Sequence, residues 1–378
     1  MLKLKKLNWK IGTISILLLG LVFISSACSI STSSSNTSTT VEKDASIFVS
    51  GDKGDTWRVM TGIASTNGKG ENISDVNVNL MTMDPEDSLA VYLATFDSGL
   101  YYTYNITNGW NKVTTLAGGA INDVKVDPKN KCTIYATLTN RVYRSKDCSR
   151  TWKQIYYDNN TAININTVAI DQFETNIIYI GTSRGEIMRS LDSGETWQTI
   201  QRLDEGIARL IISPLDGHLI FLATANNRIY SFVPRSGKDT SVPTSNSNNF
   251  LIEKWNDLNG VLANYNLGSS FKGFVICQKD GTMFIATDKV ILRSPDNGIT
   301  WESIKLLQPE KDAVINALAV NPNNAKEIYY VSNTTFFRSA DAGITWTTKK
   351  LPTKRAGRDL LTDFNNPSVI YMGTIKSK

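Results

Sequence analysis

Five aspartates recur along the chain in one short phrase, and they are the first candidates for chemistry. The phrase is Ser-x-Asp-x-Gly-x-Thr-Trp; its aspartates are Asp52, Asp147, Asp192, Asp296 and Asp341, and its tryptophans are Trp57, Trp152, Trp197, Trp301 and Trp346. Two carboxylates about 5–10 Å apart can hydrolyse a glycosidic bond. Aspartates at one position of successive repeats are spread around the molecule, however, so they do not converge on one substrate. We expect structural turns: Asp and Ser bond nearby N–H groups, and Gly supplies a positive φ.

Histidine and cysteine chemistry is sparse. His218 is the one histidine, and it follows Asp216 and Gly217 in an expected solvated turn. Without a second histidine we expect neither nucleophilic catalysis of the Ser–His type nor a metal site, and no cofactor is indicated. Cys132 and Cys148 fall on the same face of one repeat, which predicts a disulfide between them in an oxidising compartment. Cys277 fits a buried thiol.

The strands and turns that carry these residues recur along the chain at the same intervals as the tryptophans. Seven tryptophans from Trp57 to Trp346 lie 42 to 58 residues apart, and this spacing indicates a repeat architecture. Residues 121–155 contain four strand patterns: a first strand around Val124, a second over 133–137, a third over 142–144, and a fourth over 151–155 that the phrase introduces. Four strands per repeat predict a propeller blade, so the fold class is an all-β propeller.

The two ends of the repeat region predict how the ring closes. Residues 359–363 and 369–374 form a first and a second strand, whereas residues 46–50 and 56–60 form a third and a fourth. Six whole blades and one shared blade make seven, with the N-terminal strands completing the C-terminal blade. Such closure hides sheet edges. Two repeats, around Trp110 and Trp255, have lost the phrase but kept the tryptophan.

The first residues have the anatomy of a secretory signal. Four lysines precede an apolar run over 11–24, and small residues end at Ala27, so residues 1–27 are expected to be removed. The next residue, Cys28, resembles the lipidated cysteine of a bacterial lipobox, although Ser25 stands where that motif usually has Leu. The alternative is ordinary cleavage after Ala27. Residues 28–44 read as a lipidated cysteine and a flexible tether, and residues 45–378 as the propeller. The expected location is extracytoplasmic, on a lipid anchor in a bacterial membrane.

Charge patterning points to one face. The whole chain has 40 Lys and Arg against 35 Asp and Glu, and removal of the four signal lysines brings the balance close to zero, which argues against a nucleic-acid partner. Turns between second and third strands, and the last interblade connection, lie on the face opposite the phrase. They carry basic residues: Arg141, Arg184, Arg228, Lys289, Lys354, Arg355 and Arg358. This predicts a basic patch for a protein partner or an anionic ligand, against the simpler possibility of solvated turns.

The phrase resembles the Asp-box, or BNR, repeat of sialidases, sortilin-type receptors and YVTN/BNR-like propellers. The third strands, such as Tyr143-Arg144-Ser145 and Phe337-Arg338-Ser339, look most like the photosystem II assembly and stability factor family. That resemblance implies a seven-bladed, extracytoplasmic, non-enzymatic propeller that acts as a protein-binding or assembly scaffold. The alternative is a glycan-active propeller, either a glycoside hydrolase or a lectin-like binder. The Arg-Ile-Pro motif of sialidases is missing from the sequence.

Overall fold

A computed structural model describes residues 44–64, 70–216, 219–232 and 255–377. The chain divides into residues 1–41 and residues 42–378, and the second unit contains all the described structure. The expected signal, Cys28 and most of the tether lie outside the described residues. His218 lies outside them too, as do residues 234–250, where the sequence predicts a loop rich in Ser, Asn and Thr. In the part of the chain that is described, no helix is both long enough and apolar enough to cross a membrane.

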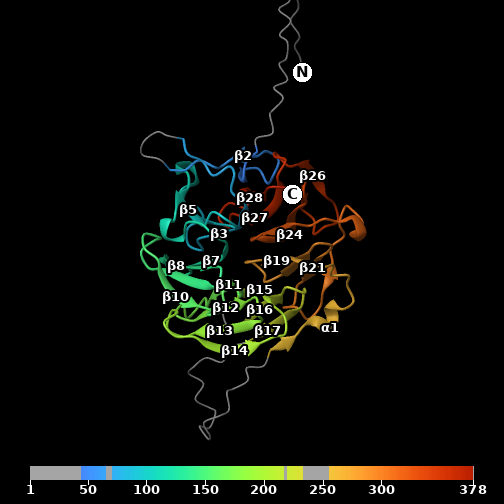
Figure 1. Cartoon of the computed structure of the whole chain (residues 1–378). Helices are drawn as coiled ribbons and strands as arrows, with labels where there is room; N and C mark the ends of the chain where they lie inside the picture. The colour runs from blue at the N-terminus through green and yellow to red at the C-terminus, as the bar shows by residue number, and fades with distance from the viewer. Residues whose placement is uncertain (1–43, 65–69, 217–218, 233–254, 378) are drawn as a thin grey trace, which may run out of the picture. The chain divides into compact units, whose positions relative to one another are not determined.

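Seven four-stranded antiparallel sheets stand in a ring, as Figure 1 shows. Blade one contains β3 (Val78–Met83), β4 (Val91–Thr95), β5 (Leu100–Thr103) and β6 (Asn111–Lys112); blade two contains β7 (Ile121–Asp127), β8 (Asn130–Leu138), β9 (Arg141–Ser145) and β10 (Lys153–Tyr157). Blade three contains β11 (Ile165–Ile170), β12 (Ile178–Thr182), β13 (Glu186–Ser190) and β14 (Gln198–Arg202); blade four contains β15 (Ile207–Ile212), β16 (Ile220–Thr224), β17 (Ile229–Phe232) and β18 (Asn256–Asp257). The first strand of each blade lies toward the centre of the ring.

The remaining blades have the same order. Blade five contains β19 (Phe271–Ile276), β20 (Met283–Thr287), β21 (Ile291–Ser294) and β22 (Glu302–Ser303); blade six contains β23 (Ala317–Asn321), β24 (Asn324–Val331), β25 (Thr335–Ser339) and β26 (Thr347–Lys350). Within the described residues, helical structure is limited to short connections: α1 (Asn259–Leu262) and the 3-10 turns η1 (Ile106–Asn108), η2 (Thr114–Leu116) and η3 (Glu310–Asp312). The predicted seven-bladed all-β propeller is therefore confirmed.

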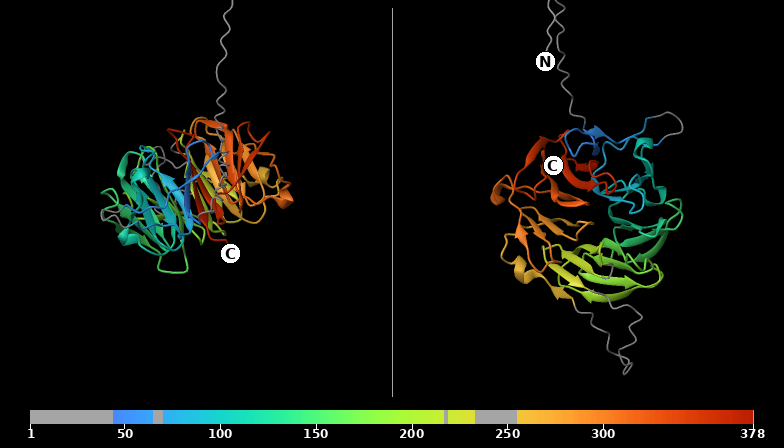
Figure 2. Two further views of the ribbon diagram at one scale, coloured as in Figure 1. Left: turned by 90° about the horizontal axis from the view of Figure 1, so that it is seen from above. Right: turned by 180° about the vertical axis from the view of Figure 1, so that it is seen from behind.

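Blade seven is shared between the two ends of the propeller. Its order is β2 (Arg58–Val59), β1 (Ile47–Ser50), β28 (Ile370–Ile375) and β27 (Ala356–Thr362). The register pairs Ile47 with Gly373 and Ser50 with Ile370, so the N-terminal strands add to the outer side of the C-terminal pair. This is the closure that the sequence predicts, and Figure 2 shows the same ring from behind.

Each aspartate of the repeated phrase holds a turn between a third and a fourth strand. In blade six, Asp341 Oδ1 accepts from Thr345 N at 2.9 Å, and Oδ2 accepts from the Thr345 hydroxyl at 2.6 Å. The Ser339 hydroxyl accepts from Gly343 N at 2.8 Å. The two bonds from Thr345 are the main reason why the pKa of Asp341 is lowered to about 2. The threonine therefore closes the turn. In blade two, where the sequence predicts a fourth strand from residue 151, the strand begins later, at Lys153.

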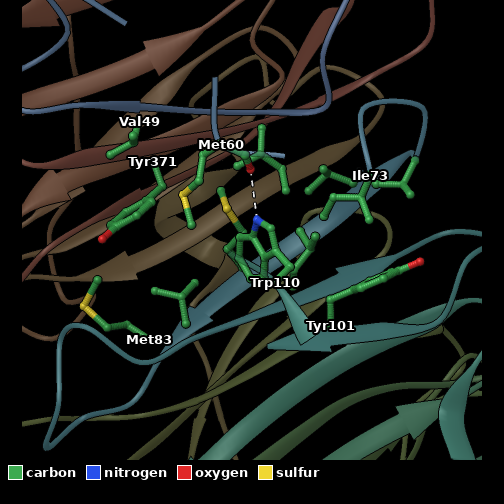
Figure 3. Packing of buried hydrophobic residues seen from close by; sticks show 13 residues of the cluster. Val49, Met60, Ile73, Met83, Tyr101, Trp110 and Tyr371 are labelled. Atoms are coloured by element: carbon green, nitrogen blue, oxygen red, sulfur yellow. Dashed lines mark hydrogen bonds between the residues drawn. The ribbon is translucent and has the colours of Figure 1, made fainter. Parts of the chain in front are cut away.

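The tryptophans join neighbouring blades. Trp346 of blade six donates to Lys305 O of blade five at 2.8 Å, and Trp57 of blade seven packs edge-on against Phe336 of blade six, with ring centroids 5.3 Å apart. Figure 3 shows Trp110 of blade one in the core, where its Nε1 donates to Met60 O at 2.9 Å. Trp110 is fully buried although its repeat lacks the phrase. Packing between blades therefore explains why the repeats that have lost the phrase still have the tryptophan.

Candidate functional site in the central channel

The two faces of the ring are defined by their turns. The phrase turns lie beside the turns that join first and second strands: Ser193 N donates to Asn176 O at 2.8 Å, and Ala342 N donates to Lys326 O at 2.8 Å. We call this side the box face. The opposite side carries the turns between second and third strands and the starts of the inner strands, and we call it the mouth face.

Most of the expected basic patch on the mouth face is neutralised or buried. Arg184 pairs with Asp158 at 3.0 Å and with Glu186 at 2.6 Å. Arg228 pairs with Glu205 at 3.3 Å, and Lys289 Nζ donates to two backbone carbonyls, the nearer being Ala313 O at 3.1 Å. These cations are already matched by acceptors of the protein itself. Arg141 and Lys354 are exposed.

Arg355 differs most from the expected exposed basic patch, because its side chain is buried and links two blades. It is 2% exposed, its Nε donates to the Thr374 hydroxyl at 3.0 Å, and its Nη2 donates to Val76 O of blade one. Burial lowers its pKa. Arg355 therefore ties blade seven to blade one and does not belong to an exposed patch.

Arg358, by contrast, reaches the central channel. Its Nη2 donates to Asn79 Oδ1 at 3.1 Å, and its guanidinium lies 5.1 Å from the ring centroid of Phe96. Burial lowers the pKa of this arginine, although Asp359 opposes that effect. Of the seven basic residues predicted for the patch, Arg358 is the one that lines a channel cavity.

A belt of asparagines joins inner strands just below the mouth face. Asn79 Nδ2 donates to Ile121 O at 2.9 Å, Asn122 Nδ2 donates to Ile165 O at 3.0 Å, and Asn166 Nδ2 donates to Ile207 O at 2.8 Å. Each asparagine occupies an irregularity in the strand register, where a bulge turns its side chain toward the next blade. Ala208 holds this position in blade four and has no amide to donate. The belt fixes the spacing of blades one to four.

A buried carboxylate lies next to the belt. Asp123 is 0% exposed, and it pairs with Lys125 at 2.6 Å and with Arg209 at 3.3 Å. Its Oδ2 also accepts from the Thr167 hydroxyl at 3.0 Å and from Val168 N at 3.1 Å. Burial alone raises a carboxyl pKa, but these partners outweigh it and leave the pKa of Asp123 lowered. This carboxylate is therefore ionised and fully engaged.

Asp359 is the second carboxylate of the channel, and its environment is different. Its Oδ2 accepts from Met81 N at 2.6 Å. Burial raises its pKa to about 6, while Met81 N, Arg209 and Arg358 oppose the rise. A carboxyl group that titrates near neutrality in a cavity is a recognised mark of a functional site.

Two cavities occupy the channel, and three residues, Leu80, Arg209 and Asp359, line both. The mouth cavity has a volume of about 250 Å³ and is lined by polar and basic groups, including the asparagine belt, Arg209, Lys272 and Arg358. The box-side cavity has a volume of about 280 Å³ and extends to Gln172, in the turn after β11. Asp359 is the one carboxylate among the residues that line either cavity. The arrangement can hold an anion, and it lacks the two free carboxylates of a glycosidase.

Sequence reasoning missed most of this site. Lys125 and Asp359 stand in inner strands that the sequence predicts, but nothing in the sequence shows that they meet Arg209 and Lys272. The usable signal was the asparagine after the first apolar residue of an inner strand, at Asn79, Asn122, Asn166 and Asn316. An amide repeated at one blade position indicates a ring of side chains around the axis.

Cys132 and Cys148 form a disulfide in the structure. It joins the start of β8 to the phrase turn of blade two, where Cys148 N also donates to Cys132 O at 3.1 Å. The crosslink lies on the box face beside Ser149, which has a φ of 67° at the position that is glycine in the other copies of the phrase. Cys277 is buried as a free thiol.

No protein-family profile matches the sequence, and no curated protein sequence matches it. Solved structures do resemble the propeller. YCF48 with a bound D1 peptide has 15% identity and a TM-score of 0.56, and the match covers 80% of this chain and 94% of that chain. YCF48 from Cyanidioschyzon merolae has 12% identity and a TM-score of 0.54, over 79% and 96%.

The chain is also similar to enzymes of glycoside hydrolase family 74. The enzyme from Niastella koreensis has 18% identity and a TM-score of 0.59, and the match covers 83% of this chain and 53% of the enzyme. The chain thus spans about half the length of that enzyme. At these identities the comparisons show the fold, and the structural neighbours of this seven-bladed propeller include the photosystem II assembly factor YCF48.

Proposed function

We propose that this chain is a non-catalytic binding propeller that takes an acidic segment of a protein partner at the mouth cavity. The observation that carries the proposal is the cavity lining, where Arg209, Lys272 and Arg358 face a single carboxylate, Asp359. Lys272 is partly buried, and its pKa is lowered by burial and by the nearby charge of Arg358. An incoming carboxylate relieves that repulsion and forms charge-assisted hydrogen bonds.

Two further observations support a binding role. The phrase aspartates are engaged in their own turns, so they are not available as acids or bases. YCF48, which shares this fold, has been seen with a peptide bound. The glycan-active alternative needs a pair of free carboxylates, and Asp123 cannot supply the second one because five donors already surround it.

We also propose that the propeller works outside the cytoplasm on a lipid anchor at Cys28. The basic head, the apolar run and the small residues before Cys28 support this. Replacement C28S should release the mature protein from the membrane fraction. Retention of C28S in that fraction would rule out the anchor.

The binding proposal is tested with labelled hexaglutamate and hexalysine peptides and residues 45–378, by fluorescence anisotropy in 0.1 M salt. Hexaglutamate should bind and hexalysine should not. Lys272→Glu should weaken the binding of hexaglutamate at least tenfold, because it reverses a charge inside the mouth cavity. The matched control is Lys354→Glu, an exposed lysine outside the cavity, which should change the affinity less than twofold. Equal losses of hexaglutamate affinity in the two variants would show that the peptide binds by general charge attraction. That result would refute a binding site in the mouth cavity.

A further inference from the structure

The two carboxylates of the channel are partnered unequally. Asp123 makes ion pairs with Lys125 at 2.6 Å and with Arg209 at 3.3 Å. Asp359 accepts from Met81 N at 2.6 Å, but within the described residues no cation forms an ion pair with it. Asp359 also lines both cavities, at a register irregularity of β27. Its charge is therefore the less directly compensated of the two.

The mouth cavity can lose its negative charge near neutral pH. Three cations line it, Arg209, Lys272 and Arg358, together with Asp359 as the one carboxylate of the lining. The pKa of Asp359 is about 6, whereas the partners of Asp123 keep the pKa of that carboxyl lowered. A proton on Asp359 therefore leaves the lining without a carboxylate, and the cavity then attracts an anion more strongly.

The strands that pack against β27 contain few titratable groups, and none of these groups lines either cavity. The strands β3 and β23 have no acidic or basic side chain, and β28 has only Tyr371, whose pKa is raised to about 12 by burial. On β24, Glu327 is paired with Lys53 and with Arg338, the two tyrosines have raised pKa values, and Lys326 is exposed.

Two lysines across the channel are the other titratable groups that line the cavities. Lys125 lines the box-side cavity and Lys272 lines the mouth cavity, and burial lowers the pKa of both. A loss of their protons would also weaken anion binding as pH rises. A variant that changes Asp359 alone separates their effect from that of the carboxyl group.

We propose that the mouth cavity binds its acidic ligand together with a proton from solvent, which Asp359 takes up. The inference rests on the proposed function, because the ligand is the acidic segment that the cavity binds. An ionised Asp359 repels a second carboxylate in the same cavity, whereas a protonated Asp359 does not repel it and can donate a hydrogen bond to it. The coupling is reciprocal, so the ligand favours the proton and the proton favours the ligand.

The first experiment measures the binding of labelled hexaglutamate to residues 45–378 at pH 6, 7 and 8 in 0.1 M salt. Glutamate side chains have a reference pKa of about 4.3, so the peptide stays largely ionised in this range. Asp359 is about half protonated at pH 6 and almost fully ionised at pH 8, so the affinity should be at least threefold higher at pH 6.

The variant Asp359→Asn removes the titrating group and keeps an acceptor for Met81 N. At pH 8 it should bind hexaglutamate at least threefold more tightly than the parent, and its affinity should change less than twofold between pH 6 and pH 8. A folding defect cannot produce this gain. The matched control is Asp204→Asn, which removes an exposed carboxylate outside both cavities, in the connection from β14 to β15, and should keep the pH dependence of the parent.

Calorimetric titration at pH 6.5, in buffers with different heats of ionisation, counts the protons directly. The parent should take up a fraction of a proton with hexaglutamate, and Asp359→Asn should take up none. Equal affinity of the parent from pH 6 to pH 8, or a pH dependence that persists in Asp359→Asn, would overturn the inference and leave the mouth site intact. Absence of hexaglutamate binding at every pH would instead overturn the proposed function, and this inference with it.

Discussion

Aspartate has two different roles in this protein: it forms turns, where its pKa is lowered, and it lines the channel, where its pKa is raised. The hydrogen bonds and the burial of each side chain decide which role it has. In the phrase turns, Asp52 and Asp341 accept from a threonine hydroxyl and a backbone N–H, and their pKa values fall to about 2. In the channel, burial raises the pKa of Asp359 to about 6. The sequence predicts the first role correctly, because Ser, Gly and Thr stand beside each aspartate. It cannot predict the second, because the groups that bury Asp359 come from other blades.

Asp359 should make the stability of the propeller fall as pH rises from about 4 to about 6. Its pKa in the folded state, about 6, is above the reference value of 3.8, so the folded chain keeps a proton that the unfolded chain has released. Asp359→Asn removes this effect and still accepts from Met81 N. The free energy of unfolding of the variant, relative to the parent, should increase between pH 4 and pH 7 by up to about 3 kcal/mol, at about 1.4 kcal/mol per pKa unit.

Urea unfolding at several pH values measures that difference. The phrase aspartates cancel in the comparison, because their lowered pKa values affect parent and variant alike and act as pH falls below about 4. A difference that stays constant from pH 4 to pH 7 would show that Asp359 titrates normally.

At the scale of elements, the inner strands do more than form the wall of the channel. The sequence predicts their positions well: it expects a strand at 359–363, and β27 covers Ala356–Thr362. It does not predict the register irregularities of these strands, because they depend on how each strand pairs with its neighbour. Those irregularities turn Asn79, Asn122 and Asn166 toward the next blade. A local pattern can therefore identify a strand without showing which way its side chains point.

Asn122→Ala should loosen the contact between blades two and three. The variant loses the 3.0 Å bond to Ile165 O and leaves that carbonyl without this donor, so the free energy of unfolding should fall by about 1 kcal/mol. Asn316→Ala is the matched control, because Asn316 bonds Asn333 of its own blade and is not part of the interblade belt. Urea midpoints of the two variants give the comparison. Equal losses would mean that the belt does not couple blades.

At the scale of the whole molecule, closure makes one cooperative unit from seven similar sheets. The sequence predicts closure because the unpaired strand patterns at the two ends complement each other. It could not predict the further ties across the same seam: Arg355 to Val76 O, and Trp110 to Met60 O. Together with the β1–β28 pairing inside blade seven, these contacts join blades seven and one. We therefore expect the ring to be most sensitive to changes at its ends.

Removal of residues 1–60 should destroy the fold, whereas removal of residues 1–43 should not. The longer deletion takes away β1 and β2, exposes the edge of β28, and removes the acceptor Met60 O from the buried Trp110 indole. An exposed strand edge also favours association with other chains. We expect the 61–378 protein to aggregate or to lose its sharp thermal transition, while the 44–378 protein melts as one unit. Calorimetry and size-exclusion chromatography distinguish the two. A monomeric 61–378 protein with an unchanged melting temperature would show that the first and last blades hold together without the shared sheet.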